Sequence, residues 1–366
     1  MPHNPQSLFI TGATGTLGKE MVALLLRETP HKLHLLIRSK NKVSAGERLG
    51  KLFSPYGLER EFETRVRVWE GDVVEPGLGL KAEDYAEISE EVDQVFHIAA
   101  LTALNGSREN CFRMNLGGTE EMLRFADRAH REGRLKRFFY FSTAYAVGSL
   151  QTFCSKEDAL PEKPAHANYY EASKYAAESK VREAMQAGLP VTIFRPSIVV
   201  GDSQTGKVSE FNVIYPFMKL FAHGLLTKIP TRLDNSFNIV PIDFVIQASL
   251  AIARREDSVG KTFHLVTQDP PSMATLFCLK EKEFPQLPPI EIVDPEAFQK
   301  EHLSPDEQIA YGMLAPYLGY LNHDLTFDTQ NTERFLAGTG IHFPKTDYQF
   351  LCTLIRYAVD VGYLIV

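Results

Sequence analysis

The sequence is poor in cysteine, with four cysteines among 366 residues. They are widely separated and form no CxxC pair, which argues against a disulfide framework and indicates reduced thiols in the cytoplasm. The eleven histidines show no ligand spacing beyond His31 and His34, which fall in an expected strand. We therefore predict no metal site. The four cysteines are Cys111, Cys154, Cys278 and Cys352.

The sequence also lacks an excess of basic residues and a long hydrophobic run. Its formal net charge of −7 argues against a nucleic-acid partner, because nucleic-acid-binding surfaces are basic. The longest apolar stretch, Phe350–Val366, is interrupted by Arg356 and Asp360. We therefore expect a buried amphipathic helix there and no transmembrane segment. Met1–Gln6 is polar and leads directly into the first expected strand, so no signal peptide is expected.

What the sequence does contain is a glycine-rich turn, TGATGTLG, at residues 11–18. Apolar residues 8–10 precede it and apolar residues at helical spacing follow it, so Gly12, Gly15 and Gly18 fall where a strand turns into a helix. Glycines at this spacing allow a tight turn, a close approach to a pyrophosphate, and close packing of helix against sheet. The start of a helix also favours a phosphate through its unpaired N–H groups. The stretch therefore predicts the dinucleotide-binding end of a Rossmann fold.

The next expected strand, residues 33–37, ends at a basic residue. In a Rossmann unit this strand end faces the adenosine ribose, where an acidic side chain binds the 2′-OH of NAD and an arginine suits the 2′-phosphate of NADP. Here Arg38 follows the strand, Arg48 lies on the next expected helix, and no acidic residue takes the place. We therefore predict a preference for NADP(H), with an ordinary surface arginine as the competing interpretation.

Two further expected strands end where a parallel sheet binds its ligands. The strand at 65–69 is followed by Asp72, whose carboxylate could accept a hydrogen bond from an adenine amino group. The strand at 95–99 is followed by Ala100. Small residues at this end let a cofactor lie close against the backbone, although simple packing would explain them as well.

The main catalytic candidates lie after the fifth expected strand and on the helix that comes next. The strand at 138–141 ends at Ser142 and Thr143, where a hydroxyl can meet a substrate. Tyr170 and Lys174 are four residues apart in an expected helix and therefore share one face. A phenol has a pKa of about 10 and needs a nearby cation to act as an acid–base catalyst at neutral pH. Lys174 can be that cation, and Thr143 can orient a substrate carbonyl. Such a pair also arises by chance, but here it follows a glycine turn and a strand-end hydroxyl.

The order of the expected elements predicts an α/β fold, a doubly wound parallel Rossmann sheet with a smaller helix-rich C-terminal substrate lobe. Strands at 191–194 and 262–266 complete the expected sheet. We assign the NADP-binding Rossmann domain to 1–201, with 237–267 returning to it, and the substrate-binding lobe to 202–236 and 268–366.

A set of motifs between residue 7 and about residue 267 carries a family resemblance. The motifs are TGATGTLG, GDVVEPGLGL from Gly71, HIAA from His97, Asn115-x-x-Gly118-Thr119, Ser142-Thr143, Tyr170-x-x-x-Lys174, RPSIVVG from Arg195 and GDSQTG from Gly201. Together they resemble the extended short-chain dehydrogenase/reductases, and within these a thioester-reductase-like branch. This branch includes the reductase domains of carboxylic acid reductases and non-ribosomal peptide synthetases, and the fatty acyl-CoA reductases.

The resemblance implies a role for each matching position. The implied catalytic residues are Thr143, Tyr170 and Lys174, with Asn115 assisting. The residues implied at the pyrophosphate are Gly12, Thr14, Gly15, Thr16, Leu17 and Gly18. Those implied at the 2′-phosphate are Arg38 and Arg48, and those at the adenine are Asp72 and Val73. Those implied at the nicotinamide and its ribose are Ala99, Ala100, Tyr170, Lys174, Pro196, Ser197, Ile198 and Val199.

The leading hypothesis for the function is an NADPH-dependent reductase that takes an acyl thioester to the aldehyde or on to the alcohol. Related reductases are commonly fused to adenylation and carrier domains that this sequence lacks, so we expect an acyl-CoA or acyl carrier protein as a partner in trans. The nearest alternative is an NADP-dependent alcohol dehydrogenase, or a ketone or aldehyde reductase, resembling the 3β-hydroxysteroid dehydrogenase or dihydroflavonol reductase groups. A sugar-nucleotide epimerase is disfavoured by Arg38, and a non-catalytic redox sensor by the Tyr170 and Lys174 pair. The residues do not indicate an oligomeric state.

Overall fold

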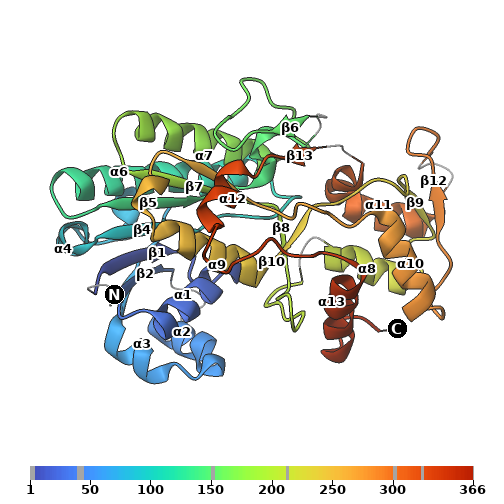
Figure 1. Cartoon of the computed structure of the whole chain (residues 1–366), viewed down its shortest axis with the longest axis horizontal. Helices are drawn as coiled ribbons and strands as arrows, with labels where there is room; N and C mark the ends of the chain where they lie inside the picture. Colours follow the sequence, from blue (N-terminus) through green and yellow to red (C-terminus); the bar gives the residue numbers. More distant parts are fainter. Residues whose placement is uncertain are drawn as a thin grey trace. The chain divides into compact units, whose positions relative to one another are not determined.

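The computed structural model describes residues 5–38, 45–149, 153–211, 214–299, 303–322 and 325–365, and Figure 1 shows how strands and helices alternate. The strands are β1 (Ser7–Thr11), β2 (Lys32–Ile37), β3 (Val66–Glu70), β4 (Gln94–His97), β5 (Arg137–Phe141), β6 (Cys154–Ser155), β7 (Val191–Pro196), β8 (Ile198–Val200), β9 (Lys228–Pro230), β10 (Ile239–Pro241), β11 (Thr262–Leu265), β12 (Glu291–Val293) and β13 (Thr326–Phe327). The helices are α1 (Thr16–Glu28), α2 (Ala45–Phe53), α3 (Glu59–Arg65), α4 (Ala82–Glu91), α5 (Arg108–Cys111), α6 (Gly118–Arg131), α7 (Tyr169–Gln186), α8 (Ile214–Ala222), α9 (Ile242–Ala253), α10 (Met273–Glu283), α11 (Pro305–Leu318), α12 (Gln330–Leu336) and α13 (Tyr348–Asp360).

Seven of the strands form one parallel sheet in the order β11-β7-β5-β4-β1-β2-β3. Strands β5 and β7 are buried along their whole length, as expected for parallel strands that helices cover on both faces. Strand β1 lies between β2 and β4. Strands β2 and β3 extend the sheet to one side of β1, and the later strands, from β4 on, extend it to the other side. Ligands of such sheets bind at this change of direction, beyond the carboxyl ends of the strands. The predicted fold class is confirmed.

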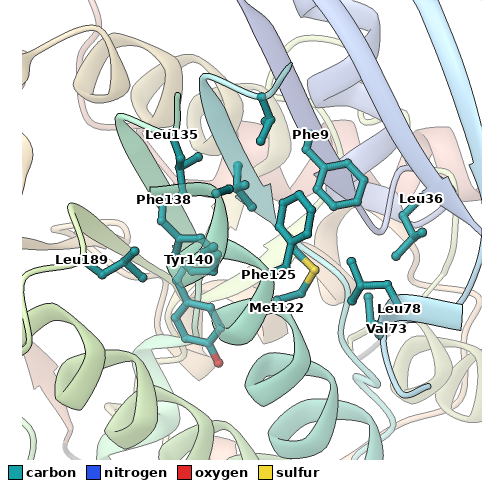
Figure 2. Close-up of a cluster of buried hydrophobic side chains, with 14 of the residues drawn as sticks. Phe9, Leu36, Val73, Leu78, Met122, Phe125, Leu135, Phe138, Tyr140 and Leu189 are labelled. Atoms are coloured by element: carbon teal, nitrogen blue, oxygen red, sulfur yellow. The ribbon is translucent and has the colours of Figure 1, made fainter. Parts of the chain in front are cut away.

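One face of the sheet is covered by α4, α6 and α7, and Figure 2 shows the apolar cluster between them and the strands. Met122 and Phe125 of α6 are three residues apart, the spacing that puts side chains on one face of a helix. They meet Phe9 and Phe138 from the strands. Tyr140 belongs to the same cluster, but its hydroxyl points away from the neighbouring apolar side chains.

The predicted glycine turn joins β1 to α1. Its three glycines differ in how closely the neighbouring backbone approaches them. Gly12 has a φ of +76°, which side chains disfavour, and a Cβ there would lie 2.6 Å from the backbone N of Ala99. A Cβ on Gly18 would lie 2.2 Å from the carbonyl O of Gly12. A Cβ on Gly15 would meet only that same carbonyl O, at 3.4 Å. The packing of the chain therefore requires Gly12 and Gly18 but not Gly15.

The helical segment around Asn115 consists of three parts. A π-helical turn, Phe112–Gly117, separates α5 from α6. Such turns insert an extra residue into a helix and occur frequently at functional sites. Asn115 lies within the π turn and is buried.

Contacts along the chain group it into two compact units. The first unit is Met1–Ala146, Tyr169–Arg195 and Ser249–Phe263, and the second is Val147–Asn168, Pro196–Ala248 and His264–Val366. The domain boundaries expected from the sequence stay a prediction. They differ from this grouping at 147–168, 196–201, 237–248 and 264–267.

The second unit consists of short strand pairs and several helices. The pairs are β8 with β10, β9 with β12, and β6 with β13, all parallel. Phe217 and Phe221 of α8 pack with Tyr311 and Leu314 of α11 in an apolar cluster that shares no residue with the cluster of Figure 2. Helix α13 includes the first part of the apolar C-terminal stretch, up to Asp360, and buries one face. Within the described residues, no helix has the length and apolar character needed to cross a membrane.

The glycine turn yields a stability prediction. Gly18→Ala should destabilise the first unit by about 1–3 kcal/mol, because the new methyl overlaps the backbone of Gly12. Gly50→Ala in α2 is the matched control, since nothing lies within 4 Å of the added Cβ. Alanine favours a helix over glycine by about 0.5–1 kcal/mol, so this control should be slightly stabilising. Urea unfolding measures both effects. Equal unfolding midpoints for the two variants would contradict the packing argument.

Candidate active site

Helix α7 presents three polar side chains on one face. Tyr170, Lys174 and Glu178 follow one another at intervals of four residues, which places them one above the other along the helix. Lys174 and Glu178 are buried and Tyr170 is half-buried. The helix therefore brings a phenol, an amine and a carboxylate to one side of the first unit.

The phenol is paired with the predicted threonine. Thr143 is buried two residues after the end of β5, and its hydroxyl is hydrogen-bonded to that of Tyr170. Its Oγ1 also accepts a hydrogen bond from the N–H of Tyr145 at 3.3 Å. Burial raises the pKa of Tyr170 to about 12, although the bond to Thr143 opposes this rise. The phenol is therefore protonated at neutral pH.

The amine of Lys174 is held by β5. Its Nζ donates hydrogen bonds to the hydroxyl of Tyr140 at 2.9 Å and to the carbonyl O of Phe141 at 2.7 Å. Burial lowers the pKa of Lys174 to about 7, and the negative charge of Glu178 opposes this lowering. The amine therefore titrates near neutral pH. Its role as the activator of Tyr170 stays a prediction.

The carboxylate of Glu178 joins α7 to two strand ends. It accepts hydrogen bonds from Nε and Nη2 of Arg195 on β7, at 3.0 and 2.6 Å, and from Oγ of Ser142 at 2.6 Å. Nε of Arg182 donates to it at 2.9 Å. The side chains of Glu178 and Arg195 are both 0% exposed. Burial alone would raise the pKa of Glu178, but Arg195 and the other donors outweigh burial and lower it to about 2.

Asn115 fastens the loop after β4 to α7. Its Oδ1 accepts a hydrogen bond from the N–H of Leu101 at 2.7 Å, and its Nδ2 donates to the carbonyl O of Leu101 at 3.1 Å. Nδ2 also donates to Oγ of Ser173, the residue before Lys174, at 2.9 Å. These contacts hold the backbone near Lys174 in place. The assisting role predicted for Asn115 stays a prediction.

A buried histidine connects the glycine turn with the contacts of Lys174. Nδ1 of His97 lies 2.8 Å from Oγ1 of Thr11, and Nε2 lies 3.1 Å from Oγ1 of Thr119. Thr119 is also hydrogen-bonded to Tyr140, which receives the amine of Lys174. Burial, and then the charge of Lys174, lowers the pKa of His97 to about 3. His97 is therefore neutral, and its two ring nitrogens link Thr11 of β1 to Thr119 of α6.

The start of α1 offers backbone groups to an anion. Gly15 is the N-cap residue and provides no side chain to the N–H groups of the first turn, which also contains no acidic residue. Gly15 is exposed, and an added Cβ would meet only the carbonyl O of Gly12. An exposed helix start of this kind binds phosphate groups. The other predicted pyrophosphate residues outside the buried Gly18 are half-buried, namely Gly12, Thr14, Thr16 and Leu17.

Two arginines and an aspartate meet at the ends of β2 and β3. Nη1 of Arg38 lies 3.6 Å from Oδ2 of Asp72, and the Arg38 side chain is 59% exposed. Arg48 donates a hydrogen bond to the carbonyl O of Arg38. Oδ1 of Asp72 accepts one from the N–H of Val74 at 3.2 Å. The structure therefore brings together the residues predicted at the 2′-phosphate and the adenine.

The remaining predicted cofactor residues of the first unit face different surroundings. The side chain of Val73 is buried in the cluster of Figure 2, so only its backbone is available to a ligand. Ala99 and Ala100 are half-buried. The N–H of Ala99 donates to Oγ1 of Thr11 at 3.3 Å, which holds the loop after β4 against the end of β1.

The predicted nicotinamide residues follow β7 along the chain. Pro196 is the last residue of β7, and Ile198 and Val199 begin β8. The N–H of Ser197 donates to the carbonyl O of Leu265 at 3.2 Å. Its hydroxyl is buried and has no hydrogen-bond partner among the described residues. An unsatisfied buried hydroxyl is unfavourable by about 1–3 kcal/mol, so this one suits a polar group of a ligand.

The side chains that could bind a metal lie apart from one another. Across the described ranges, no three His, Cys, Asp or Glu side chains gather closely enough to hold a metal ion. All four cysteines are free thiols. Burial raises the pKa of Cys111 and of Cys352.

A comparison with protein families shows to which family the chain belongs. Residues 10–249 match the profile of an NAD-binding family described as male sterility protein. The chain belongs to this family. The resemblance inferred from the motifs is therefore confirmed, and the family supports a nicotinamide cofactor.

Relatives and solved structures agree with this placement. The chain is 27% identical over 378 residues to a linear gramicidin synthase of Brevibacillus parabrevis, covering 99% of this chain and 7% of that protein. It is 28% identical over 287 residues to the fatty acyl-CoA reductase wat of Drosophila melanogaster, covering 69% of this chain and 55% of that protein. The chain thus spans less than two thirds of the length of these relatives. The terminal R domain from the myxalamid PKS-NRPS biosynthetic pathway superimposes with a TM-score of 0.84 at 27% identity, covering 100% of this chain and 93% of that one. Family and fold are those of reductases of the extended short-chain type.

Several residues of the site had no assigned role in the sequence analysis. Glu178 could have been recognised from the sequence, because it continues the four-residue spacing of Tyr170 and Lys174 along the same helix. Tyr140 could not, since it lies in the aromatic strand RFFYF and resembles a core residue. Arg195 ends a run of apolar residues in β7, and a charge at such a place indicates a buried partner.

The ion pair of Glu178 yields the next prediction. Glu178→Gln should destabilise the protein by about 3–5 kcal/mol at neutral pH, because it leaves Arg195 buried without its countercharge. Glu183→Gln on the same helix is the control, since its pair with Lys180 is exposed to solvent and should contribute little to stability. Urea unfolding of both variants measures the difference.

The same pair also predicts a pH dependence. The folded pKa of Glu178 is depressed to about 2, so its contribution is present above the unfolded value of about 4.3 and is lost as the pH falls toward 2. The stability difference between wild type and Glu178→Gln should therefore shrink between about pH 4 and pH 2. A difference that stays constant over this range would contradict the ionised state of Glu178.

Proposed function

We propose that the protein is an NADPH-dependent reductase of acyl thioesters. The observation that carries the proposal is the hydrogen bond between Tyr170 and Thr143. Tyr170 shares a face of α7 with Lys174, and Thr143 follows the carboxyl end of β5 in the Rossmann sheet. Membership of an NAD-binding family supports a hydride-transfer reaction. The thioester as substrate is supported by the names of two relatives, a fatty acyl-CoA reductase and a gramicidin synthase.

The first unit fits a dinucleotide cofactor. Gly15 is exposed at the start of α1, where a pyrophosphate could approach, and the packing of the chain does not otherwise require a glycine there. Arg38 and Arg48 would hold the 2′-phosphate and Asp72 the adenine. NADPH, when bound, would supply the hydride that, together with one proton, converts the acyl thioester into an aldehyde and a free thiol.

The side chains of α7 and β5 would stabilise the reacting carbonyl. The carbonyl oxygen would accept hydrogen bonds from Thr143 and Tyr170 and gain negative charge in the transition state. Tyr170 is protonated at neutral pH and would donate its proton to that oxygen. Lys174 would supply a positive charge beside the phenol. When the C–S bond breaks, the electron pair goes to sulfur, which takes up the proton.

The acyl donor would be an acyl-CoA or an acyl carrier protein, and both present the acyl group on a pantetheine arm. A second round of hydride transfer with the same residues would take the aldehyde to the alcohol. The same phenol and amine would also reduce a ketone, which makes an NADP-dependent alcohol dehydrogenase or ketone reductase the alternative. The stoichiometry of thiol release separates the two reactions.

Cofactor choice is testable by titration. NADPH should bind more tightly than NADH by about 10- to 100-fold, since a charge-assisted hydrogen bond contributes about 1.5–3 kcal/mol. Arg38→Ala should abolish this preference. Arg124→Ala is the control, because Arg124 is exposed on α6 and pairs with Glu121. Equal affinities of the wild type for NADPH and NADH would contradict the proposed role of Arg38.

The reaction is testable with acyl-CoAs and acyl-loaded carrier proteins. The wild type should release one thiol per NADPH consumed if the aldehyde is the product, and one per two NADPH if the alcohol is. Tyr170→Phe should lower turnover by about 10²–10⁴-fold, because it removes the proton donor and keeps the ring. Tyr169→Phe is the matched control on the neighbouring side chain, which is 50% exposed. NADPH oxidation with simple ketones and no thiol release would assign the protein to the alternative.

A further inference from the structure

The amine of Lys174 ends a buried hydrogen-bond network in which each donor and acceptor can be assigned. Thr119 is the centre of this network and is buried. Its Oγ1 lies 2.6 Å from the carbonyl O of Asn115, in the π turn, and 3.1 Å from Nε2 of His97. It is also hydrogen-bonded to the hydroxyl of Tyr140. Three partners thus surround one hydroxyl, which has one proton to donate and two lone pairs.

The partners of Thr119 decide the direction of each bond. A carbonyl oxygen only accepts, so Thr119 donates its single proton to Asn115. It must then accept from both His97 and Tyr140. The neutral ring of His97 therefore carries its proton on Nε2. Burial raises the pKa of Tyr140 well above its ordinary value, so the phenol keeps its proton and donates it to Thr119.

Tyr140 can therefore only accept from Lys174. Nζ of Lys174 lies 2.9 Å from the hydroxyl of Tyr140 and 2.7 Å from the carbonyl O of Phe141, and it donates in both bonds. Acceptors of this kind favour the charged form of an amine. The ring of Tyr140, whose centroid lies 4.4 Å from Nζ, favours that form as well. Tyr140 thus opposes the effect of burial, which lowers the pKa of Lys174.

The titratable groups around Lys174 come from α7 and from two strands. They are Glu178 and Tyr170 on α7, Tyr140 on β5 and His97 on β4. Of these, only Glu178 is charged at neutral pH, and its charge also favours the ammonium form. The charge of Arg195 is paired with Glu178. The π turn and α6 contribute an uncharged carbonyl and an uncharged hydroxyl to the network.

We propose that Tyr140 is a positioning residue that keeps the amine of Lys174 charged and in place, and that Thr119 directs it by taking up its proton. The proposal rests on the proposed function for the use of this cation beside Tyr170. Without the hydroxyl of Tyr140, the amine loses one of its two acceptors. Without the hydroxyl of Thr119, the phenol can turn its proton toward the amine, which favours the neutral form. Both changes should lower the pH at which Lys174 loses its proton.

An NMR titration of the lysine side chains tests the network without relying on turnover. The protein is labelled in its lysines, and the signal of Lys174 is identified by its loss in Lys174→Arg. The wild type should titrate near pH 7. Tyr140→Phe keeps the ring and should move the midpoint lower by about 1–2 pH units, the effect of losing one hydrogen bond to a charged group. Thr119→Val should move it in the same direction, which keeps the test valid if Tyr140→Phe does not fold.

Two conservative changes serve as controls. Thr119→Ser keeps the hydroxyl and should retain the wild-type midpoint. Tyr85→Phe removes a hydroxyl outside the network, from a tyrosine that packs against the same apolar cluster, and should also retain it. The pH profile of thiol release provides a second measurement. The rate should fall as the pH rises through the midpoint of Lys174, because the charged amine is the active form, and in Tyr140→Phe this fall should occur at lower pH.

An unchanged midpoint in Tyr140→Phe, or an equal shift in Tyr85→Phe, would overturn the proposal. A wild-type midpoint in Thr119→Val would overturn the directing role of Thr119. A lowered midpoint in Tyr140→Phe, with no thiol release by the wild type from any acyl donor, would support the role of Tyr140 and overturn the proposed function. Thiol release with the same pH profile in the wild type and in Tyr140→Phe would overturn the proposal and leave the function intact.

Discussion

The buried carboxylate of Glu178 is the constraint on which the rest of the first unit depends. A charge that has no access to water is tolerated only when hydrogen-bond donors surround it. Arg195 supplies them from β7 and Ser142 from the end of β5, so one carboxylate fixes two strand ends against one helix. Thr143 follows Ser142, and Lys174 lies one helical turn before Glu178. The ion pair therefore sets how the proposed catalytic hydroxyl and amine lie relative to each other.

The cofactor end of the same sheet depends on steric requirements of a different kind. Gly12 and Gly18 are required because the backbones of β1, α1 and the loop after β4 come too close for a Cβ. Gly15 has no such neighbour. A turn that served packing alone would explain two of the three glycines. A ligand that approaches the backbone would explain the third, in line with the dinucleotide site proposed at this turn.

Much of the fold and of the candidate site could be predicted, because buried parallel strands appear in a sequence as continuous apolar runs. The residues directly after each run lie at the carboxyl end of the sheet, where ligands bind. Thr143 was found in this way, and Tyr170 and Lys174 from their helical spacing. The contacts of Lys174 could not be predicted, since its bond to Tyr140 depends on how α7 lies against β5. The π turn at Asn115 was missed for a similar reason, because a helix with one inserted residue keeps ordinary helix-forming residues.

The protonation states of Tyr170 and Lys174 suit the proposed reduction. Burial raises the pKa of Tyr170 to about 12 and lowers that of Lys174 to about 7. A reductase needs a phenol that keeps its proton until the carbonyl oxygen becomes negative, whereas the oxidation of an alcohol needs a phenolate at the outset. The protonated resting form of Tyr170 matches the first requirement. His97, whose pKa is lowered to about 3, adds no competing charge, so the cation that this buried chain contributes is Lys174. Burial of the polar chain thus keeps the proton on Tyr170, whereas on Lys174 it disfavours the cation, and the negative charge of Glu178 opposes that effect.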